Sequence, residues 1–575
     1  MSTRASNIVA GRADLETWEA AQPQDLLAMD PNIDNVLRMH FGAAYEGARE
    51  QIAAAARLAG DREMHALVQL SNRDENLPRL QRYDSIGRRT EKIVFHPSYH
   101  EVGRRCWKTG VLSSLASRPN DLLSGALVYF LDHHGEGGHA CPIACAAGLI
   151  KLLQQLGTEE QQERLLPALL NPDYEQRLHA AQFVTEVQGG SDVGANACVA
   201  TPAVDEAGSY RISGEKWFCS VVDAGIFVVS ARLEGAPVGT KGLGLFLVPR
   251  QVGDSPNSFT IRRLKEKLGT QSMASAEVDF DGAWAEPIGP LDKGFKNLAS
   301  IVLDTSRVHN ALASCGMMRR ATLEAHTFAR HRRAFGGPII EQPMVQETLA
   351  RMRVIASAAV ASTFRLLALS DRLESEPDGN LARARRVSVN INKYWTSVWA
   401  TRVVRDGIEV LGGNGTIEDF SVLPRLYRDA MVMESWEGTH NALCAQVLRD
   451  FATRGLHRPW CAEIKRTLNA IECEGSSEPR EYAEGLHQRV KRRIGQLLAS
   501  DEETARLHIR RVVDEMCHLQ VYVAMLVELA WERKNGVESD KDAILELYRY
   551  FFIEGVVPFD DSNLPRLVRE VSGRL

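Results

Sequence analysis

Hydrophobic residues recur at helical spacing along most of the chain, and one internal stretch alternates instead. Residues 1 to about 178 read as mostly helical. Within them the run 157–170 is typical of a helix start, with Thr158 as the N-cap, glutamates in the first turn and leucines at helical spacing after it. Residues 290 to about 450 return to long amphipathic patterns that end at prolines and at the glycine turn 411–415. These patterns predict an antiparallel helical bundle in the second half of the chain.

Residues 179 to about 288 carry short β-rich segments between Gly and Asp turns. In the segment 275–280, Ala276, Val278 and Phe280 alternate with polar residues, which predicts a half-buried strand. Several such strands in a short stretch predict a small sandwich or barrel.

The patterns divide the chain into four regions. We expect an N-terminal helical domain with an extension at 1–178, a β-domain at 179–289, a helical bundle at 290–452 and an extra helical domain at 453–575. The fold class is therefore α+β and multi-domain, and the element order excludes a doubly wound nucleotide fold for the middle of the chain.

Composition and charge are ordinary for a globular protein. The 575 residues are 44% hydrophobic and 25% charged, and the formal net charge is -6. That balance argues against a protein whose main work is to bind phosphate backbones. The ten cysteines form no CxxC pair, which indicates reduced thiols. The N-terminus lacks a secretory apolar region and we find no apolar run of about 18 residues. We therefore expect a cytoplasmic protein without a membrane segment.

A glycine-rich segment at 135–140 (GEGGHA) fits a loose dinucleotide fingerprint. The helical pattern after it is followed by more helix and not by a second parallel strand, so we interpret it as a loop between helices. The nearby His133, His134, His139 and Cys141 match no standard zinc spacing, and we predict no metal site there.

Two segments of the β-region carry candidate chemistry. In 183–197 (FVTEVQGGSDVGANA), Gly189 and Gly190 permit close approach of the backbone, and Ser191 offers a short polar group. In 214–220 (GEKWFCS), Phe218 can pack on a flat ring while Ser220 bonds its edge. Read alone, 183–197 fits an ordinary polar turn equally well, and 214–220 fits a strand with ordinary core aromatics better than a ligand site.

Together the two segments resemble the flavin-binding segments of the acyl-CoA dehydrogenase β-domain. Val187 stands where the family usually has Pro, and Phe218 where it usually has Trp. The resemblance implies FAD as cofactor. It implies that Val184, Thr185 and Ser220 contact the isoalloxazine ring, that Phe218 packs against it, and that Gly190 and Ser191 lie at the cofactor or the pantetheine of the substrate.

The segment 332–336 (RRAFG) resembles the family sequence that reaches the FAD of a neighbouring subunit. The resemblance implies that Arg332 pairs with the pyrophosphate and that Phe335 packs on the adenosine side. It also implies that Asp304 and Arg307 approach the acyl-CoA. From the residues alone, 332–336 equally reads as a basic cluster at a helix C-terminus.

The segment 409–443 is the most specific one. Its WEGT sequence (436–439) resembles the family's Tyr-Glu-Gly-Thr, which implies Glu437 as catalytic base and Gly438 at the substrate. The implied FAD contacts of this segment are Glu409, Gly412, Gly413, Thr439 and Asn441. Some family branches place the base on the preceding helix, at a position that matches Ser306, and a serine cannot replace a carboxylate base.

The implied reaction is α,β-dehydrogenation of an acyl-CoA thioester. Glu437 removes the α-proton and the β-hydrogen leaves as hydride to flavin N5. A carboxylate in a dry pocket has its charged form disfavoured, which makes it a better base. The backbone N–H of Glu437 and a ribityl hydroxyl are the implied donors to the enolate oxygen.

Finer features resemble the adaptive-response (AidB-like) branch, notably 82–89, 94–100 and the helical extension after 450. That resemblance adds an alternative role in alkylation damage with DNA binding. The charge of 451–575 gives this role little support, because the region has 19 Lys+Arg against 21 Asp+Glu and only one dense basic run, at 489–493. An acyl-CoA oxidase is a second alternative. The expected partners are acyl-CoA, an electron-transfer flavoprotein and further copies of the chain as a homotetramer, a dimer of dimers. DNA is a possible partner without support from the residues.

Overall fold

The computed structural model describes residues 2–204, 206–471, 477–555, 557 and 559–574. They form two compact units. Unit 1 contains Met1–Arg62, Asp121–Gly135 and Asn310–Leu575, and unit 2 contains Glu63–Asn120 and Glu136–His309.

Unit 2 combines helices with a β-barrel. Its helices are α4 (Arg62–Ser71), which begins at the unit boundary, α5 (Pro97–Lys108), α7 (Ala140–Leu156), α8 (Glu159–Leu170) and α9 (Gly294–Asn297). The helix start at Thr158 is confirmed as a capping box. Its Oγ1 accepts from the Gln161 backbone N–H at 3.2 Å, and Gln161 Oε1 accepts from the Thr158 N–H at 3.1 Å. The glycine-rich segment at 135–140 leads into α7 from helical backbone and not from a strand, as interpreted from the sequence.

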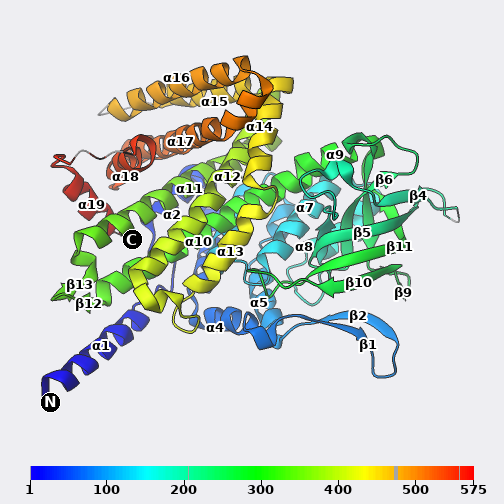
Figure 1. Cartoon of the computed structure of the whole chain (residues 1–575), viewed down its shortest axis with the longest axis horizontal. Helices are drawn as coiled ribbons and strands as arrows, with labels where there is room; N and C mark the ends of the chain where they lie inside the picture. The colour runs from blue at the N-terminus through cyan, green and yellow to red at the C-terminus, as the bar shows by residue number, and fades with distance from the viewer. Residues whose placement is uncertain (1, 205, 472–476, 556, 558, 575) are drawn as a thin grey trace. The chain divides into compact units, whose positions relative to one another are not determined.

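A two-stranded hairpin interrupts the N-terminal helices, where the sequence pattern predicted mostly helix. It pairs β1 (Arg79–Tyr83) with β2 (Arg89–Val94) and projects as a long arm (Figure 1). Most of its side chains are exposed, but Glu91 and Ile93 of β2 are buried. Because one of these two alternate residues is charged, the sequence shows no hydrophobic alternation that would indicate a strand.

The sheet of unit 2 closes on itself. Among the described residues its strands follow the order β10-β11-β5-β4-β6-β3, and β7 pairs with both β11 and β6. The pairings β11–β5–β4–β6–β7–β11 therefore complete a ring, and the predicted sandwich or barrel is a barrel. The strands are β3 (Ala180–Phe183), β4 (Val199–Pro202), β5 (Tyr210–Ser220), β6 (Ile226–Leu233), β7 (Leu243–Pro249), β10 (Phe259–Leu264) and β11 (Ser275–Pro287), and a small separate pair joins β8 (Gln251–Val252) to β9 (Ser255–Pro256).

Strand β11 departs from the predicted half-buried pattern. Ala276, Val278 and Phe280 are buried as expected, but Glu277 between them is only 3% exposed. Its carboxylate accepts from Lys265 Nζ at 2.8 Å and from Arg263 Nη2 at 2.9 Å. Both faces of the strand are covered at this point, and the ion pairs satisfy the buried charge.

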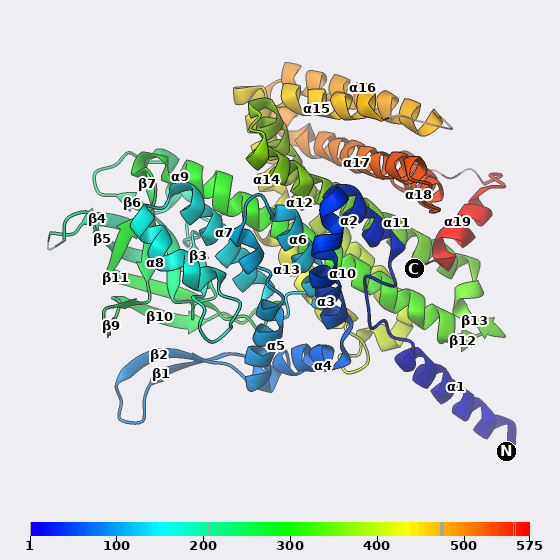
Figure 2. The ribbon, with the colours of Figure 1, turned by 180° about the vertical axis from the view of Figure 1, so that it is seen from behind.

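The core of unit 1 is a bundle of long helices (Figure 2). Its members are α10 (Leu303–His331), which begins in unit 2, α11 (Pro343–Ser375), α12 (Gly379–Leu411), α13 (Leu423–Ser435) and α14 (His440–Arg454). The N-terminal segments add α1 (Ser2–Ala20), α2 (Pro31–Phe41), α3 (Tyr45–Gly60) and α6 (Asp121–Leu131). A short hairpin, β12 (Arg333–Ala334) with β13 (Gly337–Pro338), follows α10.

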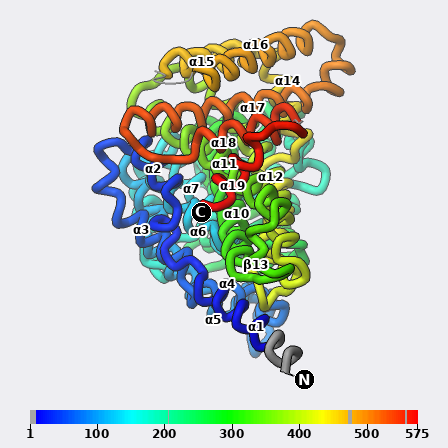
Figure 3. The backbone as a smooth tube through the Cα atoms, turned by 90° about the vertical axis from the view of Figure 1, so that its left-hand side faces the viewer, coloured from blue at the N-terminus to red at the C-terminus, as the bar shows by residue number. Residues whose placement is uncertain are grey.

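The last region of unit 1 is helical, as predicted. It contains α15 (His457–Ala470), α16 (Glu478–Ala499), α17 (Glu502–Lys534), α18 (Lys541–Tyr548) and α19 (Leu564–Gly573). Helices α15 and α16 lie side by side along α17 (Figures 1 and 3). The buried Arg353 of α11 pairs with Asp540 and donates to the Val571 carbonyl at 2.9 Å, which ties this region to the bundle.

Helix α11 is long and apolar enough to cross a membrane by length and composition, although the sequence analysis expected no such segment. Its 18-residue apolar window has a mean hydropathy of 1.5, and 83% of that window is buried inside the protein. A core helix of a bundle meets the same criterion.

Candidate active site

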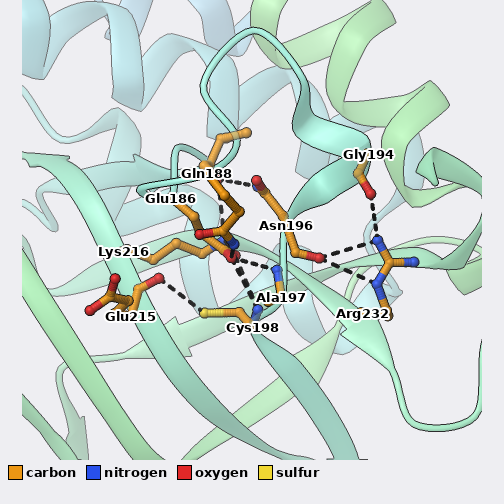
Figure 4. Close-up of polar contacts among 10 residues, drawn as sticks. Glu186, Gln188, Gly194, Asn196, Ala197, Cys198, Glu215, Lys216 and Arg232 are labelled. Atoms are coloured by element: carbon orange, nitrogen blue, oxygen red, sulfur yellow. Dashed lines mark hydrogen bonds and ion pairs between the residues drawn. The ribbon is translucent and has the colours of Figure 1, made fainter. Parts of the chain in front are cut away.

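The segment after β3 forms a loop anchored on one buried ion pair (Figure 4). Lys216 Nζ of β5 lies 2.6 Å from Oε1 of Glu186, and the two side chains are 0% and 2% exposed. The same carboxylate accepts from the backbone N–H of Ala197 at 2.5 Å and of Cys198 at 3.2 Å. A buried charge is tolerated when it is both paired and hydrogen-bonded, so this network holds the loop in one backbone conformation.

The Val184 carbonyl is fixed by two donors in the same network. Lys216 Nζ donates to it at 3.2 Å and Asn196 Nδ2 at 2.6 Å. Arg232 of β6 supports the far side of the loop, because its guanidinium donates to the carbonyls of Gly194 at 2.8 Å and Asn196 at 3.2 Å (Figure 4). The backbone of the segment expected to contact the cofactor is thus held from β5 and from β6.

The end of β5 presents a flat ring beside hydroxyl groups. The Trp217 N–H donates to the Thr185 carbonyl at 2.9 Å, which places Thr185 next to this strand end. Phe218 is 50% exposed, and Ser220 Oγ lies 3.0 Å from Ser275 Oγ. An accessible aromatic face with hydroxyls beside it suits a heteroaromatic ligand.

The two glycines of the loop differ in their surroundings. Gly190 and Ser191 are exposed, and a Cβ at Gly190 would lie 3.4 Å from Cγ2 of Thr185. Gly189 is buried, and a Cβ there would lie 2.8 Å from the Asp192 carbonyl oxygen and would collide with the Asn196 side chain. The tight turn therefore needs glycine at 189, and it leaves 190 and 191 accessible.

Two residues of the segments singled out from the sequence, Phe335 and Glu437, have a positive φ, and a third such residue, Val221, directly follows the segment 214–220. Among the described residues, the non-glycine positions with positive φ are Glu91, Val221, Thr270, Phe335 and Glu437. Val221 follows Ser220 directly, and a β-branched residue with a φ of 57° is an outlier. Strained conformations concentrate at functional sites, where the surrounding structure holds them.

Glu437 lies in the turn between α13 and α14 and has a φ of 58°. The next residue, Gly438, has a φ of 108°, and Trp436 forms the C-cap of α13. Glu437 is half-buried. Lys393 of α12 donates to the carbonyls of Glu434 at 3.1 Å and Gly438 at 3.0 Å, one on each side of this glutamate.

The other candidate FAD contacts of unit 1 lie at helix ends. Glu409, Gly412 and Gly413 are exposed at the end of α12, and nothing lies within 4 Å of a Cβ added at either glycine. Thr439 is the N-cap of α14 without a capping bond from its side chain, and Asn441 is exposed in the first turn. A helix N-terminus favours an anion, which suits a phosphate contact at Thr439.

The hairpin after α10 exposes an aromatic side chain. Phe335 is 94% exposed and has a φ of 53°, and Arg332 Nη1 lies 4.0 Å from Asp14 Oδ2. Within its own unit Phe335 therefore contributes no core packing.

The first turns of α10 carry the candidate acyl-CoA residues of unit 2. Arg307 is 8% exposed and Asp304 is half-buried. Ser306 is also buried, and its Oγ accepts from Gln182 Nε2 of β3 at 3.1 Å. The position where some related proteins have a carboxylate base is thus a hydrogen-bonded serine.

Sequence reasoning missed the charged and polar residues that support the candidate segments, namely Glu186, Lys216, Asn196, Arg232 and Lys393. The sequence around Lys393, NINKYW (390–395), places two asparagines beside the lysine and gives no local signal that this cation is buried. In the part of the chain that the structure describes, no group of three or more His, Cys, Asp or Glu side chains could hold a metal ion.

Three families match consecutive parts of the chain. Residues 18–176 match the adaptive response protein AidB N-terminal domain, residues 181–283 the acyl-CoA dehydrogenase middle domain, and residues 292–451 the acyl-CoA dehydrogenase C-terminal domain. Acyl-CoA dehydrogenase family member 11 of Caenorhabditis elegans is 33% identical over 439 residues, 74% of this chain and 70% of the relative. The AidB protein of Escherichia coli strain K12 is 35% identical over 412 residues, 69% of this chain and 73% of the relative.

Solved structures agree with these matches. The crystal structure of Caenorhabditis elegans ACDH-11 in complex with C11-CoA has a TM-score of 0.82 at 26% identity, and 96% of each chain is covered. A Bacillus anthracis acyl-CoA dehydrogenase complexed with FAD shares the fold, with a TM-score of 0.72 at 16% identity over 92% of each chain.

The matches to the middle and C-terminal domains of the acyl-CoA dehydrogenases identify the chain as a flavin-dependent oxidoreductase. The chain belongs to the acyl-CoA dehydrogenase family and carries the AidB-type N-terminal domain. The cofactor of this family is FAD. The residues fit it, because Lys216 and Asn196 hold the backbone of the loop at Val184 while the Phe218 side chain is half exposed.

Proposed function

We propose that this protein oxidises an acyl-CoA thioester to its α,β-unsaturated product, with Glu437 as the base that removes the α-proton. The observation that carries the proposal is the left-handed backbone of Glu437, with a φ of 58°. That conformation costs an ordinary residue about 1 kcal/mol or more, and glycine would adopt it freely. A glutamate at such a position is explained by the use of its carboxylate.

The reaction also requires hydrogen-bond donors to the thioester oxygen, and the backbone of the same turn is suited to provide them. A residue at a helix start offers N–H groups without an intrahelical partner, and α14 begins at His440, three residues after Glu437. Such donors stabilise the negative charge that develops on the thioester oxygen as the α-proton leaves. Bound FAD supplies the acceptor for the β-hydrogen and its electron pair.

Residues of unit 2 would hold the ring system of the cofactor. Val184 and Thr185 provide backbone held by Lys216 and by Trp217, and Phe218 provides a flat apolar face. We further propose Asp304 and Arg307 for the acyl-CoA, in line with the C11-CoA held by ACDH-11. We also propose that an electron-transfer flavoprotein accepts the electrons. The protein is proposed to be a homotetramer and to lie in the cytoplasm.

Anaerobic titration with saturated acyl-CoAs of increasing chain length tests the proposal. We expect the flavin absorbance to bleach with at least one of them. Glu437→Gln should keep FAD and lose bleaching by about 10³-fold, since a positioned base contributes about 10² to 10⁴. Glu502→Gln, an exposed surface change in the same unit, serves as control and should behave as wild type. Normal bleaching by Glu437→Gln would reject the assignment.

The two alternatives correspond to other outcomes. Rapid reoxidation by air would identify an oxidase. Absence of bleaching together with salt-sensitive duplex binding would favour a DNA-directed role. In the basic run 489–493, Arg493 lies 3.6 Å and Arg489 4.0 Å from Glu515, and Val490 is buried, so part of its charge is engaged within the protein.

A further inference from the structure

The turn that carries Glu437 is held by a cation from another helix. Lys393 lies on α12 (Gly379–Leu411) and is 0% exposed. Its Nζ donates to the Glu434 carbonyl at 3.1 Å and to the Gly438 carbonyl at 3.0 Å. These two carbonyls lie three residues before and one residue after Glu437, so a single ammonium group spans the backbone on which the glutamate is mounted.

Each of these contacts has a local reason. The Glu434 carbonyl belongs to the last turn of α13, where carbonyls have no intrahelical partner and the helix dipole favours a cation. Gly438, whose carbonyl accepts from Lys393, has a φ of 108°, a backbone conformation that favours glycine. The ammonium therefore satisfies the end of one helix and the strained turn after it at the same time.

A second residue of α12 supports the same turn. Thr401 Oγ1 donates to Glu434 Oε1 at 2.5 Å, and Thr401 follows Lys393 by eight residues, so both lie on one face of the helix. His440 Nε2 lies 3.6 Å from Glu434 Oε2. Burial, with the nearby Lys393 and Arg510, lowers the pKa of His440 to about 4, so this ring is neutral near pH 7.

Another buried lysine of unit 1 has different contacts. Lys541 is 1% exposed, and its Nζ lies 2.6 Å from the Glu528 carboxylate in the core. The two contacts given above for Lys393 are instead carbonyls on either side of the strained residue. Such contacts restrict the direction of the backbone at Glu437.

From this geometry we infer that Lys393 is the positioning residue of Glu437, which holds the turn so that the carboxylate meets the α-proton of the thioester. The inference rests on the proposed function. In this role Lys393 exchanges no proton with the substrate and acts through the Glu434 and Gly438 carbonyls to which its ammonium donates. Its loss should therefore slow proton removal and leave FAD and acyl-CoA binding nearly unchanged.

The test isolates proton removal from hydride loss. A 3-thiaacyl-CoA has an acidified α-proton but carries sulfur at the β-position, so it cannot deliver a β-hydride. The FAD-loaded enzyme is mixed with this thioester in D2O, and α-deuterium incorporation is measured by mass spectrometry. We expect Lys393→Met to exchange about 100-fold more slowly than wild type, because a base displaced by about 1 Å loses that much, with FAD content and thioester affinity within about threefold.

Two further variants separate positioning from folding. Lys541→Met removes a buried lysine of the same unit and should lower the melting temperature while it keeps the exchange rate. Gly438→Ala leaves Lys393 in place but disfavours the φ of 108°, and it should slow exchange as Lys393→Met does.

The outcomes are distinguishable. Normal exchange in Glu437→Gln rejects the proposed function itself. Loss of exchange in Glu437→Gln with near-normal exchange in a folded Lys393→Met rejects only the positioning role. Lys393→Gln is measured in parallel, and if neither Lys393 variant folds while Lys541→Met does, Lys393 is a folding residue and the inference is wrong.

Discussion

The ammonium of Lys216 and the carboxylate of Glu186 lie 2.6 Å apart inside unit 2, and neither side chain is more than 2% exposed. The pair joins strand β5 to the loop after β3. Replacement of both partners of a buried ion pair by apolar residues changes the free energy of unfolding little. Removal of one partner lowers it strongly, because the other charge stays buried without compensation.

Lys216→Met should therefore destabilise the protein by about 3 kcal/mol or more and weaken FAD binding, because the loop at Val184 loses its support. Thermal unfolding and FAD titration measure both effects. The double variant Glu186→Leu, Lys216→Met should recover part of the stability. Glu502→Gln, which removes one partner of the exposed pair with Arg506, should change neither quantity. Equal stability of Lys216→Met and wild type would contradict the role of the pair.

Gly189→Ala should reduce FAD affinity by about tenfold or more. A Cβ at this position would lie 2.8 Å from the Asp192 carbonyl oxygen and would meet the Asn196 side chain, so the loop must shift. FAD retained after gel filtration measures the loss. Gly485→Ala is the matched control, since nothing lies within 4 Å of a Cβ there and alanine favours its helix α16. Full FAD retention in Gly189→Ala would show that the loop tolerates the added atom.

Acid should destabilise unit 1 through buried histidines. Burial lowers the pKa of His133 to about 3 from an ordinary 6.5. Below pH 6.5 the unfolded chain therefore binds a proton that the folded ring refuses. The contribution of the neutral His133 to the free energy of unfolding is therefore complete above about pH 6.5, and it falls by about 2 kcal/mol when the pH is lowered to 5.

His133→Phe should reduce the fall in melting temperature between pH 7 and pH 5 by about 2 °C. The phenylalanine keeps the stacking on Phe130, whose ring centroid lies 5.8 Å from that of His133. The exposed His508 provides the comparison, and His508→Gln should leave the pH dependence as it is. An unchanged slope in His133→Phe would contradict the assigned neutral state.

Phe335→Gly should leave the fold of a single chain intact and weaken assembly. The side chain is 94% exposed, and a φ of 53° suits glycine better, so the subunit itself should gain about 1 kcal/mol. If the hairpin contacts the FAD site of another copy, the variant should dissociate at higher concentration than wild type and lose FAD more readily. Sedimentation at several concentrations tests this, and unchanged association would place the subunit contacts elsewhere.

The sequence by itself determined the elements and the chemical groups that they carry. The capping box at Thr158 and the strands of the β-region follow from residues a few positions apart, because turns, caps and periodicity depend on such near neighbours. The hairpin at 79–94 was missed because the two residues that β2 buries, Glu91 and Ile93, include a charged one and so show no hydrophobic alternation.

Tertiary structure alone decided what supports those groups. Lys216 meets Glu186 across 30 positions and Lys393 meets Gly438 across 45, and in the sequence each lysine looks like one that faces solvent. The closure of the barrel through β7 and β11 and the buried Glu277 are decided in the same way. The physical reason is that burial of a charge depends on which distant segments pack over it, and a local pattern contains no information on that packing.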